Sequence, residues 1–145
     1  MKSTFSIIIF SLFLFTSRSS QPQPFVIGKD DCHVCKMGMA DIKYGGEIIT
    51  KKGKYFKFDD MRCMNNFIKS KTIEEKDIAK TLTMNFNKPN EFIDVSSAWF
   101  VVSQELRSPM GSNAAGLATM EEAEKLKGSA GQILRWADLL EKENK

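Results

Sequence analysis

The residues best suited to chemistry form a short run of sulfur-containing side chains near the start of the chain. Cys32 and Cys35 form a C-x-x-C motif, and the methionines Met37 and Met39 follow it closely. Two thiolates in such a loop can face one ion, and thioethers add soft, neutral donors that bind without releasing a proton. Because thiolates and thioethers favour Cu(I), whereas Mg²⁺ and Ca²⁺ prefer oxygen ligands, the motif indicates a site for a soft metal.

A further sulfur stands much later in the chain, at Met110. The sequence Ser-Pro-Met-Gly over residues 108–111 is typical of a turn, because proline fixes one dihedral angle and glycine admits a positive φ. A methionine on a rigid turn is poorly placed for a core and well placed to present its sulfur. Periodicity alone leaves a core position and a ligand position equally open.

Three other interpretations of the C-x-x-C motif compete with a copper site. In an exported protein the two cysteines can simply form a structural disulfide. A zinc knuckle normally has four nitrogen or sulfur ligands, but the remaining thiol, Cys63, is distant and His33 lies within the loop. A thiol–disulfide oxidoreductase, with Cys32 attacking and Cys35 resolving, is the alternative function. The glycines that soon follow the motif do not predict the long helix of a thioredoxin-like site.

Neighbouring reactive residues have ordinary structural explanations. Cys63 falls among apolar residues of a predicted helix, where the expected role is that of a small buried hydrophobe. Asp30 and Asp31 stand beside the motif and carry charge that would attract a cation. A solvated acidic pair is the more common case.

The start of the chain indicates export. Lys2 precedes an apolar stretch from Ile7 to Phe15 that only Ser11 interrupts. A bilayer-spanning helix needs about 20 apolar residues, so this shorter run is typical of a secretory signal. We therefore predict a signal segment over residues 1–20, a flexible or extended tether over residues 21–30, and an exported, periplasmic location. Three cysteines in an oxidising compartment cannot all pair within one chain.

The composition excludes several classes of protein. The 145 residues carry a formal net charge of only +3, too small for a nucleic-acid groove. Eleven Phe, two Trp and two Tyr offer ample surface to bury, which disfavours disorder. With a single histidine, His33, and no glycine-rich phosphate loop, the sequence favours a carrier or accessory protein over an enzyme.

Short strands and short helices are expected to position these groups. Residues 46–86 and 98–135 each predict the order strand, strand, helix, strand, without residue identity between them. Asp59 or Asp60 is expected to cap the first helix, and Thr119 with Glu122 forms a capping box for the second. The predicted fold class is α+β, with two small pseudo-repeated ββαβ units packed together, one over residues 31–90 and the other over residues 91–145.

Taken together, these motifs resemble a known family. The C-x-x-C-x-M motif behind a lipoprotein-like leader, the Lys/Phe/Asp segment from Lys52 to Asp60 and the late Ser-Pro-Met-Gly turn are similar to those of the nitrous-oxide-reductase accessory proteins (NosL-type copper chaperone lipoproteins). The resemblance covers roughly Asp31 to Leu139 and implies a pair of ββαβ units. It also implies a periplasmic, usually membrane-anchored Cu(I) carrier that supplies copper for the copper-sulfide centre of nitrous oxide reductase. Its implied partner is that reductase or its assembly machinery.

Carried across motif by motif, the resemblance implies four metal residues, namely Cys32, Cys35, Met37 and Met110. Two positions depart from the family pattern. Lys36 stands where many relatives carry glycine in C-x-x-C-G-M, and Arg18 stands where the lipid-bearing cysteine belongs. Because a lipid cannot be attached at Arg18, acylation at that position is not expected in this sequence.

Overall fold

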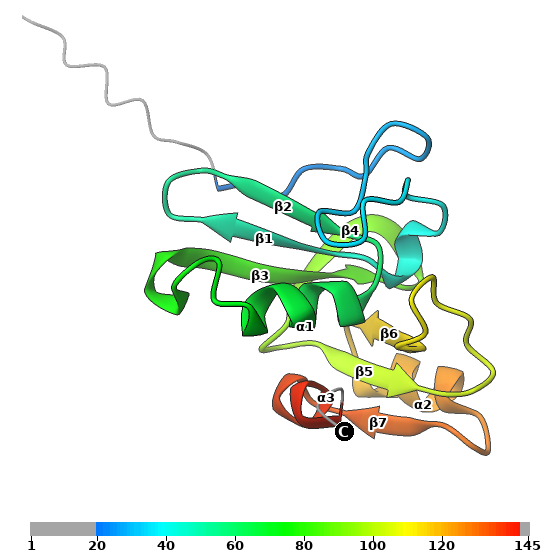
Figure 1. Ribbon diagram of the computed structural model, residues 1–145. Coiled ribbons are helices and arrows are strands. Elements are labelled where there is room, and N and C mark those ends of the chain that lie inside the picture. Colours follow the sequence, from blue (N-terminus) through cyan, green and yellow to red (C-terminus); the bar gives the residue numbers. More distant parts are fainter. Residues whose placement is uncertain (1–19, 143–145) are drawn as a thin grey trace, which may run out of the picture.

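The computed structural model describes residues 20–142 and contains two antiparallel sheets and three helices (Figure 1). All but the last residue of the predicted signal segment lies outside this range. Within the range no helix is long and apolar enough to cross a membrane. The strands and helices are, in chain order, β1 (Gly46–Thr50), β2 (Tyr55–Phe58), α1 (Met61–Lys69), β3 (Ile78–Asn85), β4 (Lys88–Asp94), β5 (Trp99–Val102), β6 (Ala114–Leu117), α2 (Met120–Lys127), β7 (Gln132–Leu134) and α3 (Trp136–Lys142).

The element order strand, strand, helix, strand occurs twice, in β1-β2-α1-β3 and in β5-β6-α2-β7. In each repeat the first strand lies between the other two strands of that repeat, since the sheet orders are β2-β1-β3-β4 and β6-β5-β7. Strand β4 adds a fourth strand to the first sheet. The predicted α+β class with two small sheets is confirmed. The division of the chain into units at residues 90 and 91 stays a prediction.

Strand β4 is an element that the sequence did not predict. Residues 87–90, Asn-Lys-Pro-Asn, have the composition of a turn, but the chain already turns at Phe86 and Asn87 and returns as β4, paired with β3. Pro89 is tolerated because β4 lies at the edge of its sheet, where a missing N–H costs no ladder hydrogen bond.

Helix α1 begins at a predicted cap and packs along one face of the first sheet. The carboxylate of Asp60 accepts a hydrogen bond from the Arg62 N–H at 2.8 Å, which satisfies one of the unpaired donors at a helix start. A Cβ on Gly46 would lie 2.7 Å from Met61 Cε and 3.1 Å from Met64 Sδ, so this glycine of β1 lets the helix approach the sheet closely. The packing fixes the position of the first turn of α1.

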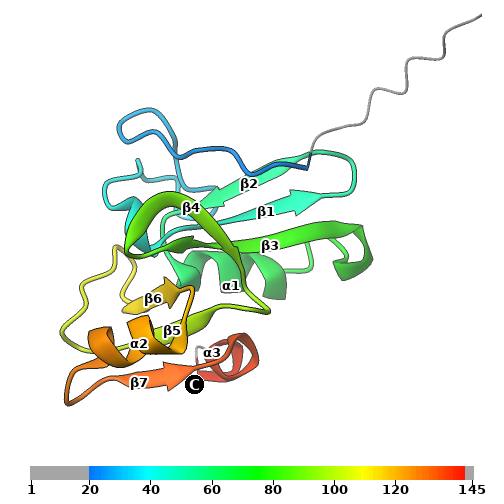
Figure 2. The same ribbon diagram turned by 180° about the vertical axis from the view of Figure 1, so that it is seen from behind.

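The second sheet packs against the first through a small residue. A Cβ on Gly116 of β6 would lie 2.5 Å from Thr83 Oγ1 of β3, and the Phe86 N–H donates to the Gly116 carbonyl at 2.9 Å. Helix α2 covers the opposite face of the second sheet (Figure 2). The two sheets thus form one body, with the loop between β5 and β6 brought beside α1.

The segment predicted as a tether lies along the first sheet before the chain reaches the cysteine motif. Phe25 is buried, and its N–H and carbonyl both bond to the side chain of Asn90 at 2.7 and 3.2 Å. The Gln23 N–H donates to Oε1 of Glu47 at 3.1 Å. Glu47 is fully buried on β1, and its Oε2 has no hydrogen-bond partner among the described residues.

Glu47 makes the stability of this packing depend on pH. Burial raises its pKa to about 7, while Lys57 on the neighbouring strand opposes this rise and Asp30 adds to it. The unfolded chain loses this proton near its ordinary value, so the free energy of unfolding falls as the pH rises toward about 7 and stays lower above it. Glu47→Gln removes the charge and retains an acceptor for the Gln23 N–H, so it is expected to stabilise the protein by about 2 kcal/mol at pH 8 and little at pH 4.

Urea unfolding at a series of pH values measures this difference. Glu121→Gln, on a side chain of α2 that is 77% exposed, is the matched control and should change the stability by less than about 0.5 kcal/mol. A gain at Glu47→Gln that is equal at pH 4 and pH 8 would contradict the assignment of a buried titrating carboxyl.

Candidate metal site

The cysteine motif forms a closed loop on the outer edge of β2. The Cys32 N–H donates to the Met37 carbonyl at 2.9 Å, and the Lys36 N–H donates back to the Cys32 carbonyl at 3.0 Å. The His33 N–H donates to the Lys57 carbonyl of β2 at 2.8 Å, which holds the loop on the sheet. These bonds fix the two cysteines relative to the start of α1, directly after β2.

Three thiols and a carboxylate converge where the loop meets the helix. One ligand atom from each of Cys32, Cys35, Asp59 and Cys63 lies within 4.8 Å of all the others. Cys35 Sγ donates to Asp59 Oδ2 at 3.4 Å, and all three thiols are free of disulfide bonds. The cluster is therefore arranged to surround one metal ion, with mostly soft donors that suit Cu(I).

Burial decides the protonation of the inner thiols. Cys32 and Cys63 are buried, whereas Cys35 is half-buried at the rim. Burial raises the pKa of Cys32 to about 11, and burial together with the nearby Cys32 thiol raises that of Cys63. Without a metal, both inner thiols are protonated and neutral at pH 7. Binding a metal must displace these protons.

Asp59 gives a second indication that a cation fits here. The residue is only 2% exposed, and its Oδ1 has no hydrogen-bond partner within residues 20–142. A buried carboxylate oxygen without a partner is costly. A cation within the cluster would offset this cost. The thiolates next to the start of α1 would in addition be stabilised by the positive end of the helix dipole. The donor set and the unpaired oxygen both fit a bound metal.

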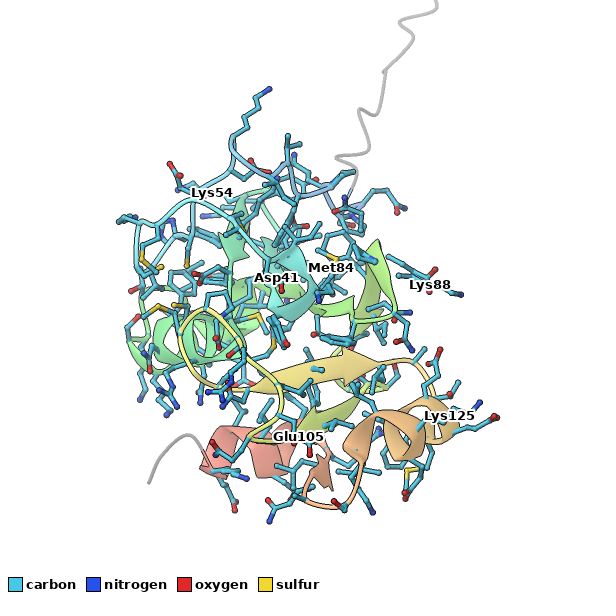
Figure 3. The ribbon with its side chains drawn as sticks, turned by 90° about the vertical axis from the view of Figure 1, so that its right-hand side faces the viewer. Asp41, Lys54, Met84, Lys88, Glu105 and Lys125 are labelled. Atoms are coloured by element: carbon cyan, nitrogen blue, oxygen red, sulfur yellow. The ribbon has the colours of Figure 1, made fainter. Side chains whose placement is uncertain are left out.

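The turn that carries Met110 lies against the start of α1. The Met110 N–H donates to Asp60 Oδ2 at 2.8 Å, and Arg62 Nη2 donates to the Gly111 carbonyl at 3.1 Å. Met110 is half-buried and packs on the core cluster that contains Cys32 and Cys63. Figure 3 shows the loop with this turn, drawn in yellow, beside α1. The turn that carries Met110, although distant in sequence, is thus held against the first turn of α1, which contains Cys63.

Two other residues of the motif, Met37 and His33, lie in different surroundings, and the role of Met37 as a ligand stays a prediction. Met37 is 48% exposed, so its thioether lies largely in solvent. The His33 ring makes edge-to-face contacts with Phe56 and Phe67, with centroids 4.8 and 5.3 Å apart. Partial burial and the neighbouring lysines lower its pKa, so it is neutral at pH 7. The structure places His33 with aromatic side chains and outside the group of clustered donors.

Sequence reasoning left two members of the cluster out. Cys63 was expected to be a buried hydrophobe; it is buried, but its thiol also lies among the donors. Asp59 was considered only as a helix cap, a role that Asp60 takes. The signal that would have found them is the spacing D-D-x-x-C, because the residue before a helix cap lies close to residues of the first turn.

Comparisons with known proteins agree with these features. A family model described as NosL matches residues 25–143. The copper-binding lipoprotein NosL of Stutzerimonas stutzeri is 28% identical over 121 aligned positions, and the match covers 76% of this chain and 62% of the relative. This chain therefore spans less than two thirds of that relative's length.

The fold is similar to that of a solved structure, the copper chaperone NosL from Shewanella denitrificans. The TM-score is 0.61 with 23% sequence identity, and the match covers 83% of this chain and 96% of the other. The resemblance drawn from the motifs is confirmed, since the family model extends from the buried Phe25 through the cysteine loop and the Met110 turn to α3. The chain belongs to the NosL family.

Proposed function

We propose that this protein is an exported carrier of Cu(I) that supplies copper for the copper-sulfide centre of nitrous oxide reductase. The observation that carries the proposal is the convergence of three thiols and one carboxylate within 4.8 Å. The name of the Stutzerimonas stutzeri relative, a copper-binding lipoprotein, supports the metal. The motifs that resemble the NosL family support the reductase or its assembly machinery as the receiver.

In this proposal the buried and half-buried donors have different tasks. The thiolates of Cys32 and Cys63 hold the ion from the inside and more than neutralise its single positive charge, while Asp59 accepts a hydrogen bond from the Cys35 thiol. Cys35 and Met110 are half-buried, so an incoming ligand from an acceptor can reach the ion on their side. The acceptor adds its own ligand before the carrier releases the metal, and the released thiolates take up protons.

The geometry does not favour the thiol–disulfide oxidoreductase. An attacking cysteine must be accessible and partly deprotonated. Cys32, the expected nucleophile, is fully buried and its pKa is raised to about 11. We therefore expect exchange with a model disulfide to be no faster than that of a free thiol.

Anaerobic titration with Cu(I) against a chromogenic chelator tests the proposal directly. We expect about one Cu(I) per chain, held more tightly than Zn²⁺. Met110→Leu should weaken Cu(I) binding about tenfold, which corresponds to about 1.4 kcal/mol, because it removes a thioether at nearly constant volume. Met37→Leu is the matched control for the exposed methionine and should leave the affinity unchanged.

Two outcomes would overturn this assignment. A native chain that fails to compete with the chelator for Cu(I) would refute the carrier function. Equal effects of Met110→Leu and Met37→Leu would refute the role of the Met110 turn while leaving the thiol cluster to be judged from the cysteine variants.

A further inference from the structure

A polar hollow lies next to the turn that carries Met110, and Gly111 of that turn is part of its lining. It has a volume of about 390 Å³ and lies where α1, the loop between β5 and β6, and the end of α3 meet. Arg62 and Lys142 bring positive charge to it, and Asn66, Gln104 and Asn113 bring side-chain amides. Among the described residues that line the hollow, none carries a carboxylate. This lining fits an anionic group.

Two residues that line the hollow also contact or neighbour residues of the candidate metal site. Arg62 precedes Cys63 on α1, and its guanidinium donates to the carbonyl of Gly111, the residue after Met110. Lys142 Nζ donates to Gln132 Oε1 at 2.7 Å, which holds the lysine against β7. Arg62 and Gly111, which line the hollow, are the chain neighbours of Cys63 and Met110, so a group bound there would lie close to the start of α1 and to the Met110 turn.

Copper transfer requires a second protein at this same place. A direct exchange of ligands brings the two metal sites together, so side chains of the partner must lie around the Met110 turn. The anion that a protein can offer there is the carboxylate of Asp or Glu, which pairs with guanidinium through two parallel hydrogen bonds. Complementary charge at such a contact speeds the encounter and fixes the orientation of the partner.

We propose that the hollow between Arg62 and Lys142 binds a carboxylate side chain from an acidic segment of the protein that exchanges copper with this chain. This inference rests on the proposed function, since it names the kind of partner that the metal site meets. It adds a recognition site that is separate from the metal ligands.

The test uses the metal-free protein and a capped peptide of three consecutive glutamates between glycines, with the glutamine peptide as a control. Amide chemical shifts of ¹⁵N-labelled protein report where each peptide binds and how tightly. We expect the glutamate peptide alone to shift residues around the hollow. The double variant Arg62→Gln with Lys142→Gln removes both cations and should weaken the affinity for the glutamate peptide about tenfold.

Two further variants separate this site from general charge effects. Lys125→Gln with Lys127→Gln removes the same charge from α2, where Lys125 is labelled in Figure 3, and should change the affinity less than about twofold. Asn66→Asp places a negative charge at an exposed position of the hollow, one helical turn after Arg62, and should weaken binding of the peptide while the Arg62 side chain is retained. It keeps the test valid where loss of Arg62 disturbs the Met110 turn.

The inference is overturned if both double variants lose affinity equally, or if Asn66→Asp binds the peptide as well as the native chain. Inorganic phosphate that produces the same shifts more strongly than the peptide would indicate a site for small anions and also refute it. Cu(I) titration of the same samples is independent. Copper binding without peptide binding refutes the inference alone, and peptide binding without copper binding refutes the carrier function.

Discussion

Replacing Cys32 and Cys63 together with serine is expected to reduce the affinity for Cu(I) by at least about a hundredfold, or about 2.7 kcal/mol. These two thiols are the buried members of the cluster, so they form the part of the site that solvent and an acceptor reach last. Serine has nearly the same volume as cysteine, but its hydroxyl is a hard, neutral donor that a soft ion binds poorly. Competition with a Cu(I) chelator under anaerobic conditions measures the loss.

The same experiment on Cys35→Ser shows whether the half-buried thiol contributes less to Cu(I) affinity than the two buried thiols. Cys35 is half-buried at the rim, so we expect a smaller loss of affinity than for either buried cysteine. Thermal unfolding of each metal-free variant separates loss of a ligand from loss of the fold. A double variant that remains folded and binds Cu(I) within about threefold of the native chain would show that the metal is held elsewhere.

Gly116→Val is expected to lower the free energy of unfolding by about 3 kcal/mol. A Cβ on this residue would lie 2.5 and 2.6 Å from Oγ1 and Cγ2 of Thr83 and 3.0 Å from the Met84 carbonyl. One of these neighbours is backbone of the central part of the first sheet, so the two sheets must separate to admit the side chain. Urea unfolding of the metal-free protein measures the change.

A graded pair of variants makes this prediction specific. Gly116→Ala should cost less than Gly116→Val, since it adds only the Cβ. Gly38→Ala is the control, because a Cβ there meets its nearest neighbour, Asp31 Oδ1, at an ordinary 3.7 Å and should change the stability by less than about 1 kcal/mol. If Gly116→Ala and Gly38→Ala are equally stable, the contact between the sheets is not as close as described.

Local signals predicted much of the fold. Asp60 caps α1, and Thr119 and Glu122 form both hydrogen bonds of the capping box of α2, because such caps depend on neighbours within one helical turn. The edge strand β4 was missed because its start looks like a turn, with a proline and Asn90 at φ 68°. The Asn90 side chain accepts a hydrogen bond from the Phe25 N–H and donates one to the Phe25 carbonyl, and these contacts with a residue distant in sequence stabilise the start of β4.

The candidate metal site was only partly predictable, because it too depends on contacts between residues that are distant in sequence. The C-x-x-C motif is local and identified Cys32 and Cys35. The approach of Cys63 depends on how α1 packs, and the approach of Met110 depends on a hydrogen bond to Asp60 across 50 positions of sequence. No pattern of neighbouring residues contains such contacts, because tertiary packing determines them.

The backbone at Lys36 shows what it costs to have lysine where the resembled family motif has glycine. Lys36 has φ 62°, in the left-handed region that costs a non-glycine residue about 1 kcal/mol. A glycine, which the family motif carries here, adopts this conformation without strain. The loop of this chain therefore holds its left-handed residue at a small cost, and the hydrogen bond from the Lys36 N–H to the Cys32 carbonyl stabilises this conformation.

Asp60 has a consequence for metal release in the proposed copper carrier. One carboxylate oxygen accepts from the Arg62 N–H at the start of α1 and the other from the Met110 N–H, so a single side chain acts as a latch between the helix and the turn. An acceptor that pulls the turn outward strains this latch and frays the helical turn that bears Cys63. In the proposed carrier, the contacts of the ion with Cys63 and with the Met110 turn would therefore weaken together.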